Sequence, residues 1–102
     1  SAYQSQWLVP PDVEEYRASF MEIGPNQHGR ITGHKAKAKM DESKLPVSVL
    51  HKVWTLADVD KDGALTLYEY ALAMHFIKMR LDGQDLPSSL PPQMLQSTEW
   101  QM

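Results

Sequence analysis

The sequence predicts an all-α fold: two helix–loop–helix units, with a short antiparallel β pairing between their loops. Apolar residues recur at spacings of three and four in four segments, in the order helix–loop–helix, linker, helix–loop–helix. The order is an approximate internal repeat, and the two loops align on a glycine, as Gly29-Arg30-Ile31-Thr32 and Gly63-Ala64-Leu65-Thr66. We therefore expect Ile31 and Leu65 to pair between the loops. The 102 residues suffice for one such domain and leave no room for a second core.

The first unit is expected at residues 12–42. Its first helix begins after two prolines with an acidic first turn, and Gly24 and Pro25 end it near residue 23. The apolar face of this helix is carried by Val13, Tyr16, Phe20 and Ile23. The second helix, about 33–42, has an apolar face made only of Ala36 and Met40, with lysines around it.

The second unit is expected at residues 46–81. Pro46 stands at the start of a third helix, about 46–57, whose apolar side consists of Val47, Leu50, Val53, Trp54 and Ala57. A fourth helix, about 67–81, is apolar on most sides, which predicts that it is buried. We expect the domain at residues 11–95, after a lead-in at 1–10 and before a tail at 96–102. The prolines after Leu86 predict an extended strap rather than a helix.

Composition excludes several classes of function. The net charge of −3 argues against a nucleic-acid-binding protein, and no apolar run approaches the roughly 18 residues of a membrane span. The chain has no cysteine, which excludes disulfides and cysteine zinc sites and fits an intracellular protein. The sequence also has no Ser/His/Asp order, no phosphate-binding loop and no pair of histidines at metal-ligand spacing, so we do not expect an enzyme.

Residues 58–69 fit the EF-hand calcium loop at each constrained position. Alternating aspartates converge on one side of a curled loop, glycine at position six permits the sharp turn, and glutamate at position twelve can bind with both oxygens. The expected ligands are Asp58, Asp60, Asp62, the backbone carbonyl of Ala64, Thr66 and Glu69. Four carboxylates against one lysine favour one bound Ca²⁺ over a solvated acidic turn.

The first loop, residues 24–35, is degenerate. At loop positions one, three, five and twelve it carries Gly24, Asn26, His28 and Lys35, so no carboxylate stands at these ligand positions. A lysine ammonium replaces the bidentate glutamate, and we expect no calcium here. The remaining task of this loop is structural, through the pairing with the second loop.

A longer run resembles a known family. The stretch 43–63, read as SKLPVSVLHKVWTLADVDKDG, is similar to an EH domain, as are 30–33, 69–77 and 86–92, so the resemblance covers about residues 12–95. The sequence around the calcium loop is most similar to the C-terminal EH domains of EHD-type dynamin-like ATPases. EH domains bind Asn-Pro-Phe peptides, and the resemblance implies a pocket between the second and third helices formed by Lys37, Met40, Leu50 and Trp54.

The resemblance implies a protein-interaction module of endocytic and membrane-recycling traffic, with a structural Ca²⁺. We expect a monomeric domain that is cytoplasmic and reaches endocytic or plasma membranes through its parent protein. Residues 30–54 hold six basic and two acidic groups, a net +4, which favours Asn-Pro-Phe peptides with acidic flanks.

Four alternatives remain open at this stage. The pocket residues could be plain core, and the lysines a solvated face. The lysine face could instead contact anionic phospholipid. The domain could also be a calmodulin-type regulator that opens a groove lined by Met74 and Met79.

Overall fold

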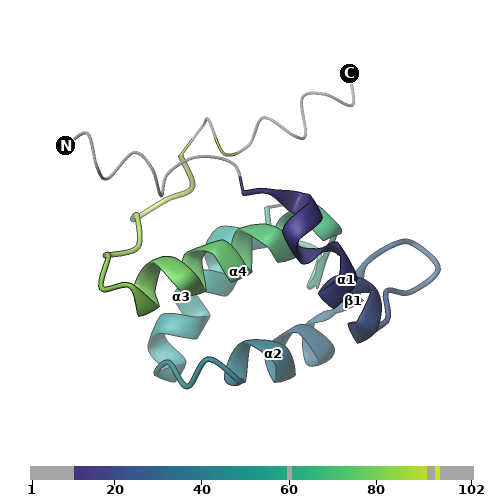
Figure 1. Ribbon diagram of the computed structural model, residues 1–102, viewed down its shortest axis with the longest axis horizontal. Coiled ribbons are helices and arrows are strands. Elements are labelled where there is room, and N and C mark those ends of the chain that lie inside the picture. The colour runs from purple at the N-terminus through teal and green to yellow at the C-terminus, as the bar shows by residue number, and fades with distance from the viewer. Residues whose placement is uncertain (1–10, 60, 92–93, 95–102) are drawn as a thin grey trace.

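The computed structural model describes residues 11–59, 61–91 and 94, and the expected lead-in and tail lie outside this part of the chain. The described residues form four helices and one two-stranded sheet (Figure 1). The elements are α1 (Val13–Ile23), β1 (Ile31–Thr32), α2 (Gly33–Asp41), α3 (Val47–Ala57), β2 (Ala64–Leu65) and α4 (Leu67–Leu81). This order confirms the expected all-α class with its short antiparallel pairing.

The helix boundaries lie within one residue of those expected. Asp12 is the N-cap of α1, and its carboxylate accepts a hydrogen bond of 3.1 Å from the backbone N–H of Glu14. Pro46 is the N-cap of α3 rather than its first residue, and α2 ends at Asp41, with Glu42 as its C-cap.

The two loops are joined by the expected β pairing. Ile31 pairs with Leu65 and Thr32 with Ala64, in antiparallel register. Ile31 and Leu65 are fully buried, so each closes the core beneath its own loop. A change in the conformation of one loop therefore also shifts the backbone of the other.

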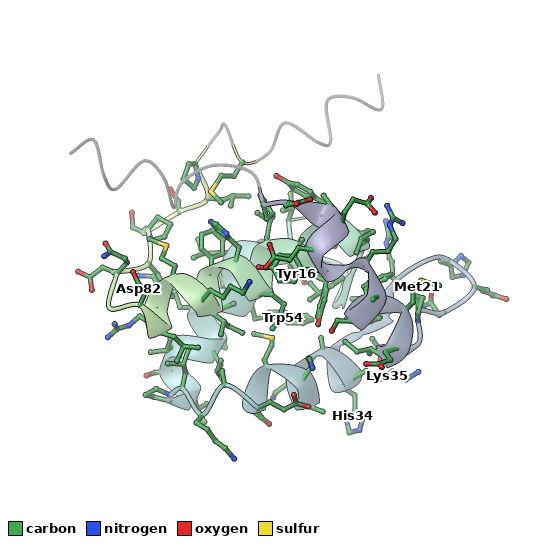
Figure 2. The ribbon with its side chains drawn as sticks, viewed as in Figure 1. Tyr16, Met21, His34, Lys35, Trp54 and Asp82 are labelled. Carbon is green, nitrogen blue, oxygen red and sulfur yellow. The ribbon has the colours of Figure 1, made fainter. Side chains whose placement is uncertain are left out.

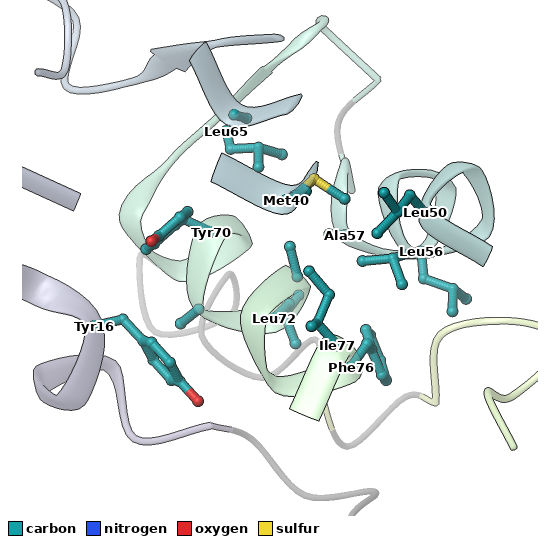
Figure 3. Close-up of a cluster of buried hydrophobic side chains, with 14 of the residues drawn as sticks. Tyr16, Met40, Leu50, Leu56, Ala57, Leu65, Tyr70, Leu72, Phe76 and Ile77 are labelled. Atoms are coloured by element: carbon teal, nitrogen blue, oxygen red, sulfur yellow. The ribbon is translucent and has the colours of Figure 1, made fainter. Parts of the chain in front are cut away.

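Helix α4 is the centre of the core. Eight of its fifteen residues are buried, as its nearly continuous apolar sequence predicts, and it packs against α1 and α3. Figure 3 shows its side chains meeting those of the other helices, among them Tyr16 from α1 and Leu50 and Leu56 from α3. The Tyr16 and Phe20 rings both contact the Tyr70 ring, at centroid distances of 6.4 and 5.8 Å.

Two apolar residues at helix ends lie outside the core, Val47 from the predicted apolar side of the third helix and Leu81 from the end of the fourth. Val47 is 81% exposed and Leu81 is 58% exposed. Each stands at the end of its helix, Val47 as the first residue of α3 and Leu81 as the last of α4. Helical spacing gives a direction around the axis but does not say whether a neighbour covers the end of the helix.

The segment after α4 packs as an extended strap. Residues 84–91 form neither helix nor strand, and Leu86 and Leu90 pack against the core. Met94 is fully buried, and its backbone carbonyl accepts a hydrogen bond from the Tyr68 hydroxyl. The burial of Met94 was not predicted from the sequence. In the described part of the chain, no helix has the length and apolar character needed to cross a bilayer.

Candidate functional site

Three carboxylates of the second loop converge. Asp58, Asp62 and Glu69 each place one oxygen within 4.8 Å of the others. Asp58 precedes β2 and Glu69 lies in the first turn of α4, and both are only 4% exposed. Buried carboxylates held this close repel one another, and hard oxygen donors are the ligands that Ca²⁺ prefers. The donor set therefore fits calcium.

Backbone amides hold these carboxylates in place. Asp58 Oδ2 accepts from Gly63 N at 3.2 Å. The two oxygens of Glu69 accept from Thr66 N and Val59 N, each at 2.9 Å. Because these hydrogen bonds reach across the loop from both ends, they curl it around the carboxylate cluster.

The remaining expected ligands have different surroundings. Thr66 is the N-cap of α4, and its hydroxyl accepts from Glu69 N, completing a capping box with that glutamate. Ala64 lies in β2, and Asp60 lies outside the described residues. The one lysine of the loop, Lys61, donates to the carbonyl of Thr55 at 3.0 Å, near the end of α3.

The first loop is held together by its own polar groups. The side-chain oxygen of Asn26 accepts from the backbone N–H groups of His28 and Arg30, at 2.9 and 3.1 Å. Lys35, at loop position twelve, donates from Nζ to the carbonyl of Gly24, at position one, over 3.2 Å. Figure 2 labels Lys35 beside His34 at the start of α2. The Lys35 ammonium thus bridges the two ends of the loop. Its positive charge repels a metal ion.

A pocket of about 480 Å³ opens between α2 and α3. The four residues that the resemblance implied, Lys37, Met40, Leu50 and Trp54, all line it. Met40 and Leu50 are buried, and Figure 3 shows the Met40 side chain extending toward Leu50. Trp54 is half-buried, one turn along α3 from Leu50. The pocket therefore has an apolar floor and an open mouth.

Sequence reasoning missed half of the lining: Gly33, Asp41, Val47 and His51. Val47 and His51 share the face of α3 that carries Leu50 and Trp54, at spacings of three and four, so periodicity places them on that face without showing that it borders a pocket. Asp41 lies one turn from Lys37 on α2 in the same way. Gly33 lies one turn before Lys37 on the same face of α2, but without a side chain it gave no signal in the sequence pattern.

Gly33 also connects the pocket with the second loop. A Cβ atom built at Gly33 would lie 3.0 Å from the carbonyl oxygen of Gly63 and 3.5 Å from Trp54 Cη2. The start of α2 therefore packs against both the candidate calcium loop and the candidate pocket. The absence of a side chain at this position permits the approach.

The structure changes how the basic charge of residues 30–54 is distributed. Arg30 pairs with Asp62 at 2.9 Å, and Lys39 pairs with Glu42 at 3.2 Å. The hydrogen bond between Lys39 and Glu42 raises the pKa of the Lys39 ammonium. The pocket rim itself carries one lysine and one carboxylate, Lys37 and Asp41, so it is less basic than the sequence count implied.

Comparisons of sequence and of structure with known proteins all find EH domains. The EH domain family profile matches residues 8–101. The chain is 49% identical over 90 residues to EH domain-containing protein 1 of Homo sapiens and 50% identical over 91 residues to EH domain-containing protein 3 of Rattus norvegicus. These matches cover 88% and 89% of the chain but only 17% of each relative, so the chain spans about a sixth of their length. Among solved structures, the second EH domain of AtEH1/Pan1 matches with a TM-score of 0.76 and 34% identity, covering 81% of this chain and 80% of that one.

Proposed function

Because the chain belongs to the EH domain family, a family of protein-interaction modules, we propose that it binds Asn-Pro-Phe peptides in the pocket between α2 and α3. The observation that carries the proposal is that Lys37, Met40, Leu50 and Trp54 line one pocket of about 480 Å³. A volume in the range of about 300–1,000 Å³ is typical of small-ligand sites.

The chemistry of the pocket suits an aromatic side chain. Its floor is apolar, through Met40 and Leu50, so burial of a phenylalanine ring there is favourable. Trp54 offers an aromatic surface against which that ring can pack, and the thioether of Met40 adds a polarizable contact. A short Asn-Pro turn presents such a ring at little further cost in conformational entropy, because proline is already restricted.

A titration followed by NMR tests the pocket. An Asn-Pro-Phe peptide is expected to shift the amide resonances of α2 and α3 saturably, and Trp54→Ala is expected to weaken binding at least about tenfold. Met21→Ala removes a side chain that is 60% exposed on α1 and is expected to leave the affinity unchanged. Undiminished binding by a folded Trp54→Ala protein would contradict the assignment.

We further propose that Lys37 favours peptides with an acidic residue beside the Asn-Pro-Phe turn. Its exposed ammonium lies at the rim of the pocket, where it attracts a carboxylate on the peptide, while Asp41 on the same rim limits the preference. An acidic flank is therefore expected to tighten binding only about two- to fivefold at low salt. Lys37→Gln is expected to remove that advantage, whereas equal affinity for acidic and neutral peptides in the wild type would exclude it.

We propose that one Ca²⁺ binds in the second loop and has a structural role. Asp58, Asp62 and Glu69 would hold it, together with the remaining oxygen donors of the loop. Bound calcium neutralises the repelling carboxylates between α3 and α4 and so stabilises the angle between these helices.

Calorimetric titration tests the calcium site directly. The wild type is expected to bind one Ca²⁺ per chain, and Glu69→Gln is expected to lower the affinity by tenfold or more. Glu22→Gln makes the same charge change at an exposed position of α1 and is expected to bind normally. A stoichiometry of zero, or of two, would contradict the proposal.

We propose that the domain acts as the recognition module of a longer cytoplasmic protein at endocytic or recycling membranes. The support is that the matched relatives are about six times as long as the matched segment. The full-length protein is expected to colocalise with endocytic membranes and to lose Asn-Pro-Phe partners, but not its fold, on Trp54→Ala. Full-length protein that keeps these partners after the substitution would contradict this role.

A further inference from the structure

An arginine from the first loop reaches into the second. Arg30 stands immediately before β1, and its NH1 atom lies 2.9 Å from Asp62 Oδ2. The other oxygen of Asp62 accepts from Ala64 N at 3.0 Å. Arg30 is thus placed on a carboxylate at position five of the candidate calcium loop, although it belongs to the loop without carboxylate ligands.

The β pairing positions this contact. Ile31, next to Arg30, is held against Leu65, and Thr32 against Ala64, so the backbone beside both partners is fixed. The side chains of Arg30 and Asp62 are 39% and 30% exposed. Solvent therefore screens the pair only in part, and its strength depends on the charges around it.

The second loop has an excess of negative charge that its own lysine does not offset. It holds four carboxylates and one lysine, and among the described residues the ammonium of Lys61 donates to the Thr55 carbonyl rather than to a carboxylate. Arg30 brings a positive charge to this cluster from outside the loop.

We propose that Arg30 is a built-in counter-ion of the calcium loop, which stabilises the loop when it is empty of metal and thereby weakens calcium binding. The inference rests on the proposed calcium site. Without calcium, the guanidinium offsets repulsion among the carboxylates. With calcium bound, Asp62 shares its charge with the metal, and Arg30 is repelled by a nearby dication. The arginine therefore stabilises the metal-free domain more than the loaded one.

The opposite effect, in which Arg30 favours calcium, would require that Arg30 hold the loop in its binding shape. The hydrogen bonds within the loop argue against it. Asp58 is already bonded to Gly63 N, and Glu69 to Thr66 N and Val59 N. These hydrogen bonds already fix the curled conformation of the loop. Arg30 therefore acts on calcium affinity mainly through its charge.

The test compares the wild type with Arg30→Met, which keeps an apolar stem and removes the guanidinium. Calorimetric titration is expected to show calcium binding about three- to tenfold tighter in the variant, the range expected for a partly exposed ion pair. In a calcium chelator, the variant is expected to melt roughly 2–6 °C lower than the wild type. Both differences are expected to shrink in about 1 M salt, where the Debye length is about 3 Å.

Two control variants separate the contact from net charge. Arg30→Lys keeps the positive charge and is expected to stay within about twofold of the wild-type affinity. Lys35→Met removes a cation from the same loop that donates to Gly24, and it is expected to leave calcium affinity near the wild-type value. If Arg30→Met does not fold without metal, Arg30→Gln serves for the same comparison.

The outcomes separate this inference from the proposed function. A wild type that binds no calcium would overturn the calcium site and the inference together. A wild type that binds one calcium, with equal or weaker binding by Arg30→Met, would overturn the inference alone. Tighter binding by Lys35→Met equal to that of Arg30→Met would also overturn it, because the effect would then belong to net charge.

Discussion

Gly33 connects the two candidate sites, because a residue without a side chain can pack closely against both of them. Any Cβ at this position would lie 3.0 Å from the Gly63 carbonyl and 3.5 Å from the ring of Trp54. The pocket and the calcium loop therefore share one tight packing contact. This connection gives a residue-scale test of whether the two sites depend on each other.

Gly33→Ala is expected to weaken both peptide and calcium binding, because the methyl group pushes α2 away from Gly63 and Trp54. We expect a several-fold loss in each affinity and a lower melting temperature, although alanine has the better helix propensity by about 1 kcal/mol. Paired calorimetric titrations with peptide and with calcium measure both effects.

His34→Ala is the matched control, since His34 is exposed in the same helical turn. It is expected to change neither affinity. If Gly33→Ala bound both ligands with wild-type affinity, the close packing of α2 against the two sites would not contribute to binding.

At the same scale, the sequence predicted one half of the pocket and missed the other. The resemblance implied Lys37, Met40, Leu50 and Trp54, whereas the spacing of four between Leu50 and Trp54 predicts only that they share one face of α3. Asp41 and His51 share the faces of these residues, but whether a face borders a pocket or the core depends on how α2 and α3 meet. That angle is a property of tertiary packing, which a spacing within one helix does not contain.

At the scale of elements, an ion pair joins α1 to α4. The Lys78 ammonium contacts Glu15 and lies 5.0 Å from the centre of the Tyr16 ring. The hydrogen bond to Glu15 is the main cause that raises the pKa of Lys78, with Tyr16 contributing next. Burial raises the pKa of the Tyr16 hydroxyl.

Both shifts predict that the domain loses stability in alkaline solution. A raised lysine pKa contributes stability that is complete below the unfolded value, about 10.4, and is lost as the pH rises through the folded value. The tyrosine shift has the same sign, because the folded state favours its proton. Since Lys78 is 49% exposed, its contribution at neutral pH is expected to be below about 1 kcal/mol.

Lys78→Met tests this interpretation. Denaturant unfolding at pH values from 7 to about 11 is expected to show a shallower alkaline loss of stability than in the wild type. Arg17→Met, which breaks an exposed pair with Glu14 on the outside of α1, is expected to keep the wild-type profile. Equal slopes for the wild type and Lys78→Met would show that the contact has no net effect.

A side-chain hydrogen bond from α4 helps to hold the strap, in addition to apolar packing. Tyr68→Phe removes the hydroxyl that donates to the Met94 carbonyl. We expect a loss of about 0.5–1.5 kcal/mol in unfolding free energy and faster amide exchange at Met94, whose N–H donates to Pro91. Unchanged exchange at Met94 would show that packing alone holds the strap.

Elements were predicted unevenly, and the reasons are physical. The β pairing followed from two loops aligned on glycine, because the repeat fixes both register and partner. The helix boundaries followed from prolines, glycines and an acidic first turn. Met94 is buried next to a residue 26 positions earlier in the chain, Tyr68, whose hydroxyl donates to its carbonyl, and no local pattern encodes such a contact.

At the scale of the whole molecule, we expect the proposed calcium ion to stabilise the domain rather than to switch it, because only the second loop carries carboxylates at its ligand positions. Met79, named as a possible groove residue, is 5% exposed and Met74 is half-buried, so a calmodulin-type switch would have to expose both. Calcium addition is therefore expected to raise the melting temperature while the binding of an apolar dye stays nearly constant. A large increase in dye binding would favour the calmodulin-type alternative.

The net negative charge of the chain is concentrated in the second loop. The −3 of the sequence equals the excess in residues 58–69, four acidic against one basic, and the remaining 90 residues are balanced at nine and nine. One bound Ca²⁺ would bring the total to −1. The mild acidity therefore belongs to the candidate metal loop and does not oppose acidic peptides at the pocket.

In the proposed complex, the pocket between α2 and α3 receives the phenylalanine of an Asn-Pro-Phe peptide. The most direct measurement is a set of intermolecular nuclear Overhauser effects between that ring and the protein. We predict contacts from the ring to the Met40 methyl group, the Leu50 methyl groups and the Trp54 indole. Saturable binding with ring contacts only elsewhere, such as the hollow beside Thr55 and Leu90, would contradict this assignment of the pocket.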